Sequence, residues 1–205
     1  NKAKSLITKA IETTNKLIIE GMAAHPQNLL TVNTSENDNL EESLPISIPY
    51  LPPSTNASSY TLVLDLDETL VHYIENDIEP KLLIRPGAQQ FLREMAKIYE
   101  LVIFTAAMQD YADWALGQLD TAGWISHRLY RQHTSMNKGI FIKDLSRVGR
   151  HLNKTIIVDN VADNFSKQPE NGILIKSWYD DPNDDALFEL GPLLKLIVNK
   201  KQQEL

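Results

Sequence analysis

The fold is decided by the stretch Tyr60-Thr61-Leu62-Val63-Leu64-Asp65-Leu66-Asp67-Glu68-Thr69. Residues 60–66 form a nearly continuous apolar run, which is typical of a strand buried on both faces of a parallel sheet. Carboxylates interrupt and follow this run, and they are costly to bury unless they are paired or bound to a metal. The stretch therefore predicts a buried strand over residues 60–66 with polar chemistry at its carboxyl end.

Strand and helix patterns alternate along the rest of the chain. Short apolar runs predict strands over residues 100–104, 127–131, 140–143, 155–158 and 172–175. Apolar residues spaced three and four apart predict helices over residues 86–98, 109–119 and 184–200. Together these elements predict an α/β fold, with a Rossmann-like parallel sheet flanked by helices. In such sheets the functional site lies beyond the carboxyl ends of the strands.

Residues 1–59 differ in composition from the rest of the chain. Residues 3–23 have the spacing of an amphipathic helix, and residues 25–59 are rich in Asn, Ser, Glu and Pro. We therefore divide the chain into an N-terminal helix and extended linker, residues 1–59, and a folded domain, residues 60–205. The helix either packs on the domain or docks a protein partner. The linker either extends freely or lies as a strap across the domain surface.

Composition excludes several classes of protein. The formal net charge of −7 and the lack of a Lys/Arg run argue against direct binding of nucleic acid. The absence of cysteine excludes disulfides, thiolate metal sites and a cysteine nucleophile. No apolar stretch approaches the ~20 residues that cross a bilayer, so we expect no membrane span. The chain starts at Asn1, so we expect a fragment, and an upstream anchor or targeting segment stays open.

Polar residues follow three of the predicted strands. Asp65 and Asp67 stand at the end of the first, Thr105 follows the second, and Asp159 and Asn160 follow the strand over residues 155–158. A parallel sheet would gather the three aspartates at one edge. Carboxylates about 4 Å apart repel by roughly 4 kcal/mol at an effective dielectric near 20. A cation offsets this repulsion, and oxygen-only ligands favour Mg²⁺ over zinc.

The run over residues 65–72 resembles the DxDxT motif of haloacid-dehalogenase-type phosphatases. More narrowly, it is similar to the NLI-interacting-factor-like family, which includes the small phosphatases of the RNA polymerase II C-terminal domain. The resemblance covers about residues 60–194 and implies a haloacid-dehalogenase-like fold with a minimal cap. Further matches occur in the family's order: Arg85-Pro86-Gly87, Phe104-Thr105-Ala106-Ala107, Tyr111-Ala112-Asp113, Leu129-Tyr130-Arg131, Lys143-Asp144-Leu145-Ser146-Arg147 and Val158-Asp159-Asn160.

The resemblance implies a Mg²⁺-dependent phosphoserine/phosphothreonine protein phosphatase with an aspartyl-phosphate intermediate. Asp65 would be the nucleophile. Asp67 would protonate the leaving oxygen and then activate water. Asp65, the backbone carbonyl of Asp67 and Asn160 would hold Mg²⁺, with Asp159 alongside.

The resemblance also implies roles for residues around this group. Thr105 and Lys143 would bind the phosphoryl oxygens. Thr69 would orient the general acid and cap the loop, and Tyr111 and Arg131 would line the substrate groove. Each of these residues also has a purely structural interpretation. The Asp and Thr residues at the strand ends would be turn formers, Lys143 a surface lysine, and Tyr111 a tyrosine that packs at a rim. We interpret His72 as a hydrogen-bonded structural histidine, the three tryptophans as core residues, and the acidic residues between 180 and 185 as a solvated turn and helix start.

The chain departs from the family between His72 and Arg85, where only about a dozen residues stand in place of an expected longer insertion. We therefore expect an open site, which favours a phosphorylated protein over a small metabolite. Two alternatives stay open: a small-molecule phosphatase of the same superfamily, and a protein-binding scaffold like the mitochondrial import receptor subunit that shares the fold. Residues 1–59 are the candidate contact for a partner. We expect a nuclear or cytoplasmic location, with mitochondria as the alternative.

Overall fold

The computed structural model describes residues 46–54, 60–75 and 80–202. The helix expected over residues 3–23 and most of the linker expected over residues 25–59 lie outside the described residues. In the part of the chain that is described, no helix is long and apolar enough to cross a membrane.

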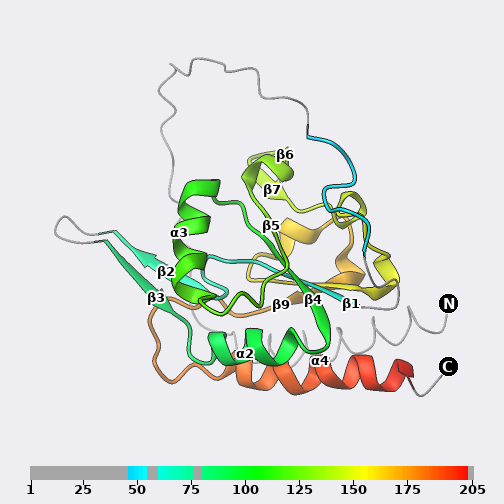
Figure 1. The fold of residues 1–205 in the computed structure, drawn as a ribbon. Coiled ribbons are helices and arrows are strands. Elements are labelled where there is room, and N and C mark those ends of the chain that lie inside the picture. Colours follow the sequence, from blue (N-terminus) through cyan, green and yellow to red (C-terminus); the bar gives the residue numbers. More distant parts are fainter. Residues whose placement is uncertain (1–45, 55–59, 76–79, 203–205) are drawn as a thin grey trace, which may run out of the picture.

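A five-stranded parallel sheet forms the centre of the molecule (Figure 1). The strand order is β5-β4-β1-β8-β9, and every neighbouring pair is parallel. The predicted α/β fold is therefore confirmed. The bounds are β1 Tyr60–Leu64, β4 Tyr99–Phe104, β5 His127–Leu129, β8 Thr155–Asp159 and β9 Gly172–Leu174.

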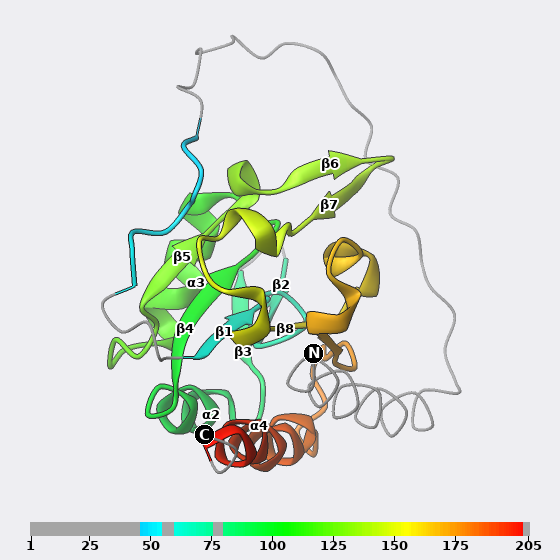
Figure 2. The same cartoon turned by 90° about the vertical axis from the view of Figure 1, so that its right-hand side faces the viewer.

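Side chains of β1 alternate between two apolar clusters, as the two-residue period of a strand requires. Leu62 and Leu64 pack with the buried faces of α2 (Ala88–Met95), α3 (Gln109–Leu119) and α4 (Ala186–Gln202). Val63 packs on the opposite face of the sheet, among residues of the neighbouring strands, of loops and of short 3-10 helices. Helices α2 and α4 run side by side beneath the sheet (Figures 1 and 2).

Two helices begin later than the sequence predicts. Helix α2 starts at Ala88 rather than residue 86, because Gly87 adopts a left-handed φ of 78° that ends the preceding turn. Helix α4 starts at Ala186 rather than residue 184. Asp184, which was expected in a solvated turn, is buried and bonded to Arg85 instead. Helix α3 spans residues 109–119, as predicted.

Two antiparallel hairpins were not predicted. β2 (Val71–Ile74) pairs with β3 (Lys81–Ile84), and the pair projects from the body of the domain (Figure 1). β7 (Ile140–Ile142) lies within the strand predicted over residues 140–143, and it pairs with β6 (Ser135–Asn137), a strand that was not predicted. Their two-residue turn has positive φ at both Lys138 and Gly139, as two-residue hairpins favour. The described residues between His72 and Arg85 thus belong mostly to two strands that pair with each other.

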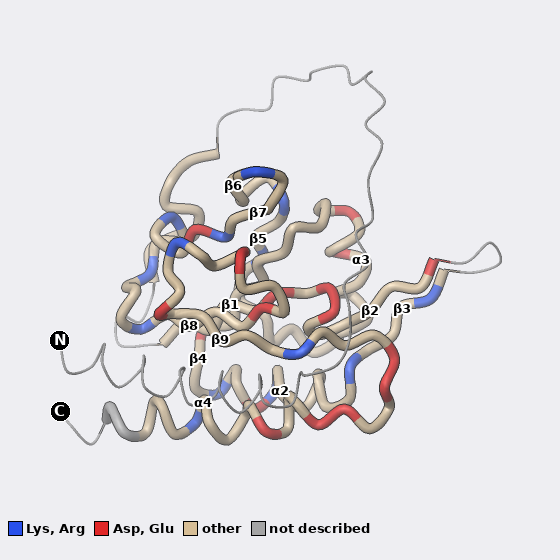
Figure 3. The backbone as a smooth tube through the Cα atoms, turned by 180° about the vertical axis from the view of Figure 1, so that it is seen from behind, with Lys and Arg blue, Asp and Glu red and all other residues tan. Residues whose placement is uncertain are grey.

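The remaining short helices are 3-10 turns that connect the strands. Their bounds are η1 Arg131–His133, η2 Leu145–Arg147, η3 Leu152–Lys154, η4 Ala162–Phe165 and η5 Pro169–Asn171. The Lys and Arg residues of the described chain are spread over several elements, with Asp and Glu between them (Figure 3).

Candidate active site

Asp65 is the first residue after β1, and the sheet fixes its position. Its amide donates to Val158 O at 3.0 Å, which extends the pairing of β1 with β8. The chain then turns sharply, because Leu70 N donates to Leu66 O at 2.8 Å. This turn brings Asp65 and Asp67 to the carboxyl edge of the sheet, where the parallel strands place the ends of β4 and β8 as well.

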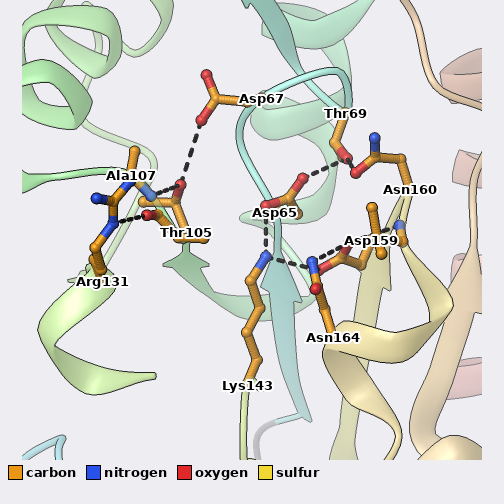
Figure 4. A network of polar contacts seen from close by, with 12 residues as sticks. Asp65, Asp67, Thr69, Thr105, Ala107, Arg131, Lys143, Asp159, Asn160 and Asn164 are labelled. Atoms are coloured by element: carbon orange, nitrogen blue, oxygen red, sulfur yellow. Dashed lines mark hydrogen bonds and ion pairs between the residues drawn. The ribbon is translucent and has the colours of Figure 1, made fainter. Parts of the chain in front are cut away.

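Lys143 lies at the centre of the site and has no exposed surface. Its Nζ lies 2.5 Å from Asp65 Oδ1 and 2.6 Å from Asp159 Oδ2 (Figure 4). The Lys143 amide donates to Asn164 O at 2.6 Å, which ties the end of β7 to η4. The interpretation of Lys143 as a surface lysine is therefore wrong. One buried cation compensates two buried carboxylates.

The second oxygen of Asp65 is also held. Thr69 Oγ1 donates to Asp65 Oδ2 at 2.8 Å and lies 3.5 Å from Asn160 Oδ1. Thr69 has no exposed surface, and its hydroxyl contacts Asp65 rather than Asp67. The expectation that Thr69 orients the general acid is therefore wrong, because its hydroxyl donates to the nucleophile candidate Asp65. The expectation that Thr69 contacts the substrate stays a prediction.

Burial and charge act in opposite directions on Asp65. Burial raises the pKa of Asp65 to about 7, although the neighbouring Lys143 opposes the shift. Burial lowers the pKa of Lys143, but the facing charges of Asp159 and Asp65 outweigh it, and the pKa of Lys143 is raised. The ammonium form of Lys143 is thus favoured, and it stabilises the carboxylate form of Asp65.

The Asp67 carboxylate points toward Thr105 rather than toward Lys143 (Figure 4). Tyr111 Oη donates to Asp67 Oδ1 at 2.6 Å, and Thr105 Oγ1 lies 3.5 Å from Asp67 Oδ2. Burial raises the pKa of Asp67, and the Tyr111 hydrogen bond is the largest opposing cause. The sequence placed Tyr111 in a substrate groove, whereas the structure places its hydroxyl directly on the candidate general acid.

Thr105 and Arg131 are joined through the loop that follows β4. Ala107 N donates to Thr105 Oγ1 at 3.0 Å, and Arg131 Nε donates to Ala106 O at 2.6 Å (Figure 4). The guanidinium carbon of Arg131 lies 4.9 Å from the centre of the Phe141 ring. Arg131 is exposed, whereas Thr105 is buried.

The residues around Asp65 fit a magnesium ion, but the ligands are not the three aspartates that the sequence was expected to gather. Among the described residues, no group of three or more His, Asp or Glu side chains could hold a metal. Lys143 lies between Asp65 and Asp159, and the Asp67 side chain turns away. Asp65 and the Asn160 amide oxygen both approach the Thr69 hydroxyl, so they lie close together. Mg²⁺ prefers oxygen ligands that include one or two carboxylates, which this pair and the Asp67 carbonyl would supply.

One buried residue near the site received no role from its sequence. Arg85 is 1% exposed and donates to both carboxylate oxygens of Asp184, at 2.6 and 2.8 Å. Its Nη1 also donates to Thr69 O at 3.0 Å, so it fixes the loop that carries the two aspartates. The sequence shows an Arg before Pro-Gly but gives no sign of a partner 99 residues away.

Trp114, which was expected in the core, is 44% exposed and lies beside Tyr111. His72 is hydrogen-bonded, as interpreted, to Glu68 at 3.0 Å.

Comparison with known proteins gives the chain a family. Residues 60–204 match the family described as NLI interacting factor-like phosphatase. A Dictyostelium discoideum relative named "Probable C-terminal domain small phosphatase" is 42% identical over 171 residues, which are 76% of this chain and 55% of the relative. The "CTD small phosphatase-like protein" of Mus musculus is 34% identical over 204 residues, which are 86% of this chain and 74% of that protein.

The chain spans about half the length of this Dictyostelium relative. It spans 29% of a second relative from the same organism, "CTD small phosphatase-like protein 2". Among solved structures, fission yeast Fcp1, an RNA polymerase II CTD phosphatase bound to beryllium fluoride, aligns with a TM-score of 0.51 at 18% identity. The alignment covers 72% of this chain and 53% of Fcp1, and it supports the fold. The match over residues 60–204 and the similarity to the Mus musculus relative, of which the chain covers 74%, agree: this chain belongs to the NLI interacting factor-like phosphatase family.

Proposed function

We propose that this chain is a Mg²⁺-dependent phosphoserine/phosphothreonine protein phosphatase that works through an aspartyl-phosphate on Asp65. The observation that carries the proposal is the position of Asp65 at the end of β1, with its two oxygens bound by Lys143 and Thr69. A fixed carboxylate beside a buried cation is suited to attack phosphorus, because it need not reorganise before it reacts. Membership of a phosphatase family supports the same reaction.

In the first step, a carboxylate oxygen of Asp65 attacks phosphorus, and the bond from phosphorus to the serine or threonine oxygen breaks. Asp67, as the carboxylic acid, gives its proton to the leaving oxygen. The raised pKa of Asp67 supports this role, because it increases the protonated fraction. Tyr111 holds Asp67 in place through a 2.6 Å hydrogen bond.

In the second step, water attacks phosphorus of the aspartyl-phosphate, and the bond between phosphorus and the Asp65 oxygen breaks. Asp67, now the carboxylate, accepts the proton of the water. Inorganic phosphate leaves and the Asp65 carboxylate is restored. General acid–base help of this kind is typically worth ~10²–10⁴-fold in rate.

Charge stabilisation of the phosphoryl group comes from residues on both sides of Asp65. We assign Lys143 and Thr105 to the phosphoryl oxygens, because the first supplies a buried positive charge and the second a hydroxyl 3.5 Å from the Asp67 carboxylate. Magnesium bound by Asp65, Asn160 and the Asp67 carbonyl would neutralise the charge shared by the carboxylate and the phosphoryl group. Asp159 keeps Lys143 in position from the other side.

We propose a phosphorylated protein as substrate, with Tyr111 and Arg131 beside the groove that receives it. Several relatives carry the name of a C-terminal-domain small phosphatase, which makes a phosphorylated protein tail the first class of substrate to test. Residues 1–59 remain the proposed contact for a protein partner. We propose a nuclear or cytoplasmic location.

Hydrolysis of p-nitrophenyl phosphate and of a serine-phosphorylated peptide tests this function. We expect activity with Mg²⁺, loss of activity with EDTA, and recovery when Mg²⁺ is added back. Asp65→Asn should be inactive with both substrates, whereas Asp163→Asn, which changes an exposed carboxylate outside the site, should retain activity. A folded wild-type chain that hydrolyses neither substrate would instead support a scaffold.

A further inference from the structure

A short segment that precedes the domain is bound to its surface next to the candidate site. We call residues 49–52 the strap. Tyr50 N donates to Arg147 O at 2.9 Å, and Leu51 N donates to Val148 O at 3.2 Å. Arg150 Nη1 donates to the carbonyl oxygen of Pro52 at 2.9 Å. The strap therefore follows residues 147–150 through successive hydrogen bonds.

Close packing fixes the register of the strap. Gly149 has φ +86°, and a Cβ at this position would lie 2.6 Å from Pro49 Cβ, so only glycine leaves room for the strap. Leu51 is 5% exposed and belongs to the apolar cluster on the second face of the sheet. Because the strap is closely packed, its side chains can hold the neighbouring side chains in fixed positions.

The ring of Tyr50 touches two aromatic residues that lie next to the site. Its centre is 6.5 Å from that of Phe104 and 5.2 Å from that of His133, with both pairs edge to face. Aromatic pairs prefer defined ring orientations such as this edge-to-face arrangement, so they restrict the angle between the rings. Tyr50 thus bridges the end of β4 and η1.

Each of these aromatic neighbours adjoins a residue that we assign to the substrate. Phe104 directly precedes Thr105 in the chain. His133 Nδ1 accepts a hydrogen bond from Tyr130 N at 3.0 Å, and Tyr130 directly precedes Arg131. The Tyr50 ring therefore contacts both Phe104, which adjoins Thr105, and His133, which holds the residue before Arg131.

We propose that Tyr50 is a positioning residue, whose ring sets the placement of Thr105 and Arg131 against the phosphorylated substrate. The inference rests on the proposed function for what these two residues bind. The positioning itself is independent of it, because the ring contacts and hydrogen bonds exist without substrate. The strap is thus part of the active-site scaffold rather than a linker that only passes over it.

Steady-state kinetics of Tyr50→Ala and Tyr50→Phe in the full chain separate positioning from general stability. A loss of folded protein lowers kcat and leaves KM unchanged, whereas displaced substrate contacts raise KM. Because Thr105 and Arg131 would both be displaced from the substrate, we expect Tyr50→Ala to lower kcat/KM for a phosphopeptide by about tenfold, with a rise in KM as part of that loss. Tyr50→Phe keeps the ring and should stay close to wild type. Leu190→Ala, which truncates a buried residue of α4 on the other face of the sheet, should leave KM unchanged.

NMR spectra of the same variants test the positioning without any substrate. Burial lowers the pKa of His133. Tyr50→Ala should move this pKa up toward its usual range and shift the amide signals of Thr105 and Arg131, whereas Leu190→Ala should do neither. Unchanged signals for these three residues in Tyr50→Ala would overturn the inference, even if the wild-type chain proves inactive. In an active wild type, a KM that Tyr50→Ala leaves unchanged would overturn it as well. Inactivity of the wild type with shifted signals would refute the proposed function and retain the positioning.

Discussion

The ammonium group of Lys143 lies between Asp65 and Asp159, 2.5 Å from the first carboxylate and 2.6 Å from the second. All three side chains are almost fully buried. Two carboxylates and one ammonium leave one formal negative charge, in a place where an uncompensated charge is costly. This relationship explains how the sheet tolerates two aspartates at neighbouring strand ends, and it makes stability and activity depend on the same lysine.

Lys143→Met should therefore destabilise the domain and abolish turnover. Removal of one partner from a buried ion pair costs about 3–5 kcal/mol, because the remaining charges lose their compensation. The measurement is chemical unfolding followed by circular dichroism. In Lys143→Met/Asp159→Asn, one uncompensated carboxylate is removed, so part of the stability should return without the activity. Full stability in Lys143→Met alone would contradict the role of the lysine in compensating both carboxylates.

Arg85→Met tests the buried pair that fixes the loop of the site. Arg85 Nε and Nη2 both bind Asp184, and Nη1 binds Thr69 O. We expect a loss of about 3–5 kcal/mol in the free energy of unfolding, because Asp184 would remain buried without its partner. The matched control is Arg93→Met on the exposed side of α2, which should change this free energy little. Equal effects of the two substitutions would mean that the Arg85 pair does not stabilise the fold.

Glu100 should make the stability depend on acid. Hydrogen bonds from Arg150, at 2.6 and 2.7 Å, lower the pKa of Glu100. A carboxyl group whose pKa is lower in the folded state stabilises the fold at neutral pH, and this contribution is lost as the pH falls through the folded-state pKa. The stability difference between wild type and Glu100→Gln should thus be largest near pH 7 and shrink from about pH 5 downward.

Thermal unfolding over a pH series measures this difference. The control is Glu189→Gln, which changes an exposed glutamate of α4 and should show no comparable trend. A difference for Glu100→Gln that grows as the solution is acidified would give the wrong sign and reject the role of this ion pair.

Deletion of residues 1–40 distinguishes partner recruitment from support of the domain. The strap lies beyond the deleted residues and keeps its contacts with residues 147–150. We therefore expect hydrolysis of p-nitrophenyl phosphate to be nearly unchanged. A large loss of this activity in a soluble deletion variant would show that the deleted segment supports the catalytic domain.

Much of the fold could be predicted from the sequence because its strands are buried on both faces. The run over residues 60–64 and the apolar stretches of β4 and β8 differ clearly from the surrounding chain. Such runs predict parallel strands, and polar residues after them predict the edge of the site. The hairpin of β2 and β3 could not be found this way, because its residues are mostly half-exposed and lack a clear alternation.

The finer geometry of the candidate site depends on tertiary contacts. The sequence brings Asp65, Asp67 and Asp159 to one edge, but it does not show that Lys143 lies between two of them or that Asp67 turns toward Tyr111. Thr69 is four residues from Asp65, so its 2.8 Å hydrogen bond follows from the tight turn. Such a contact requires backbone geometry, which motif spacing alone does not provide.

The central claim is that Asp65 becomes phosphorylated during turnover. We would quench the wild-type chain with acid while it hydrolyses p-nitrophenyl phosphate with Mg²⁺, and then digest it for peptide mass spectrometry. We expect one phosphoryl group on Asp65 in the wild type and none in Asp65→Asn. An actively turning-over chain that carries no phosphoryl group on Asp65, or carries it on another residue, would contradict the account.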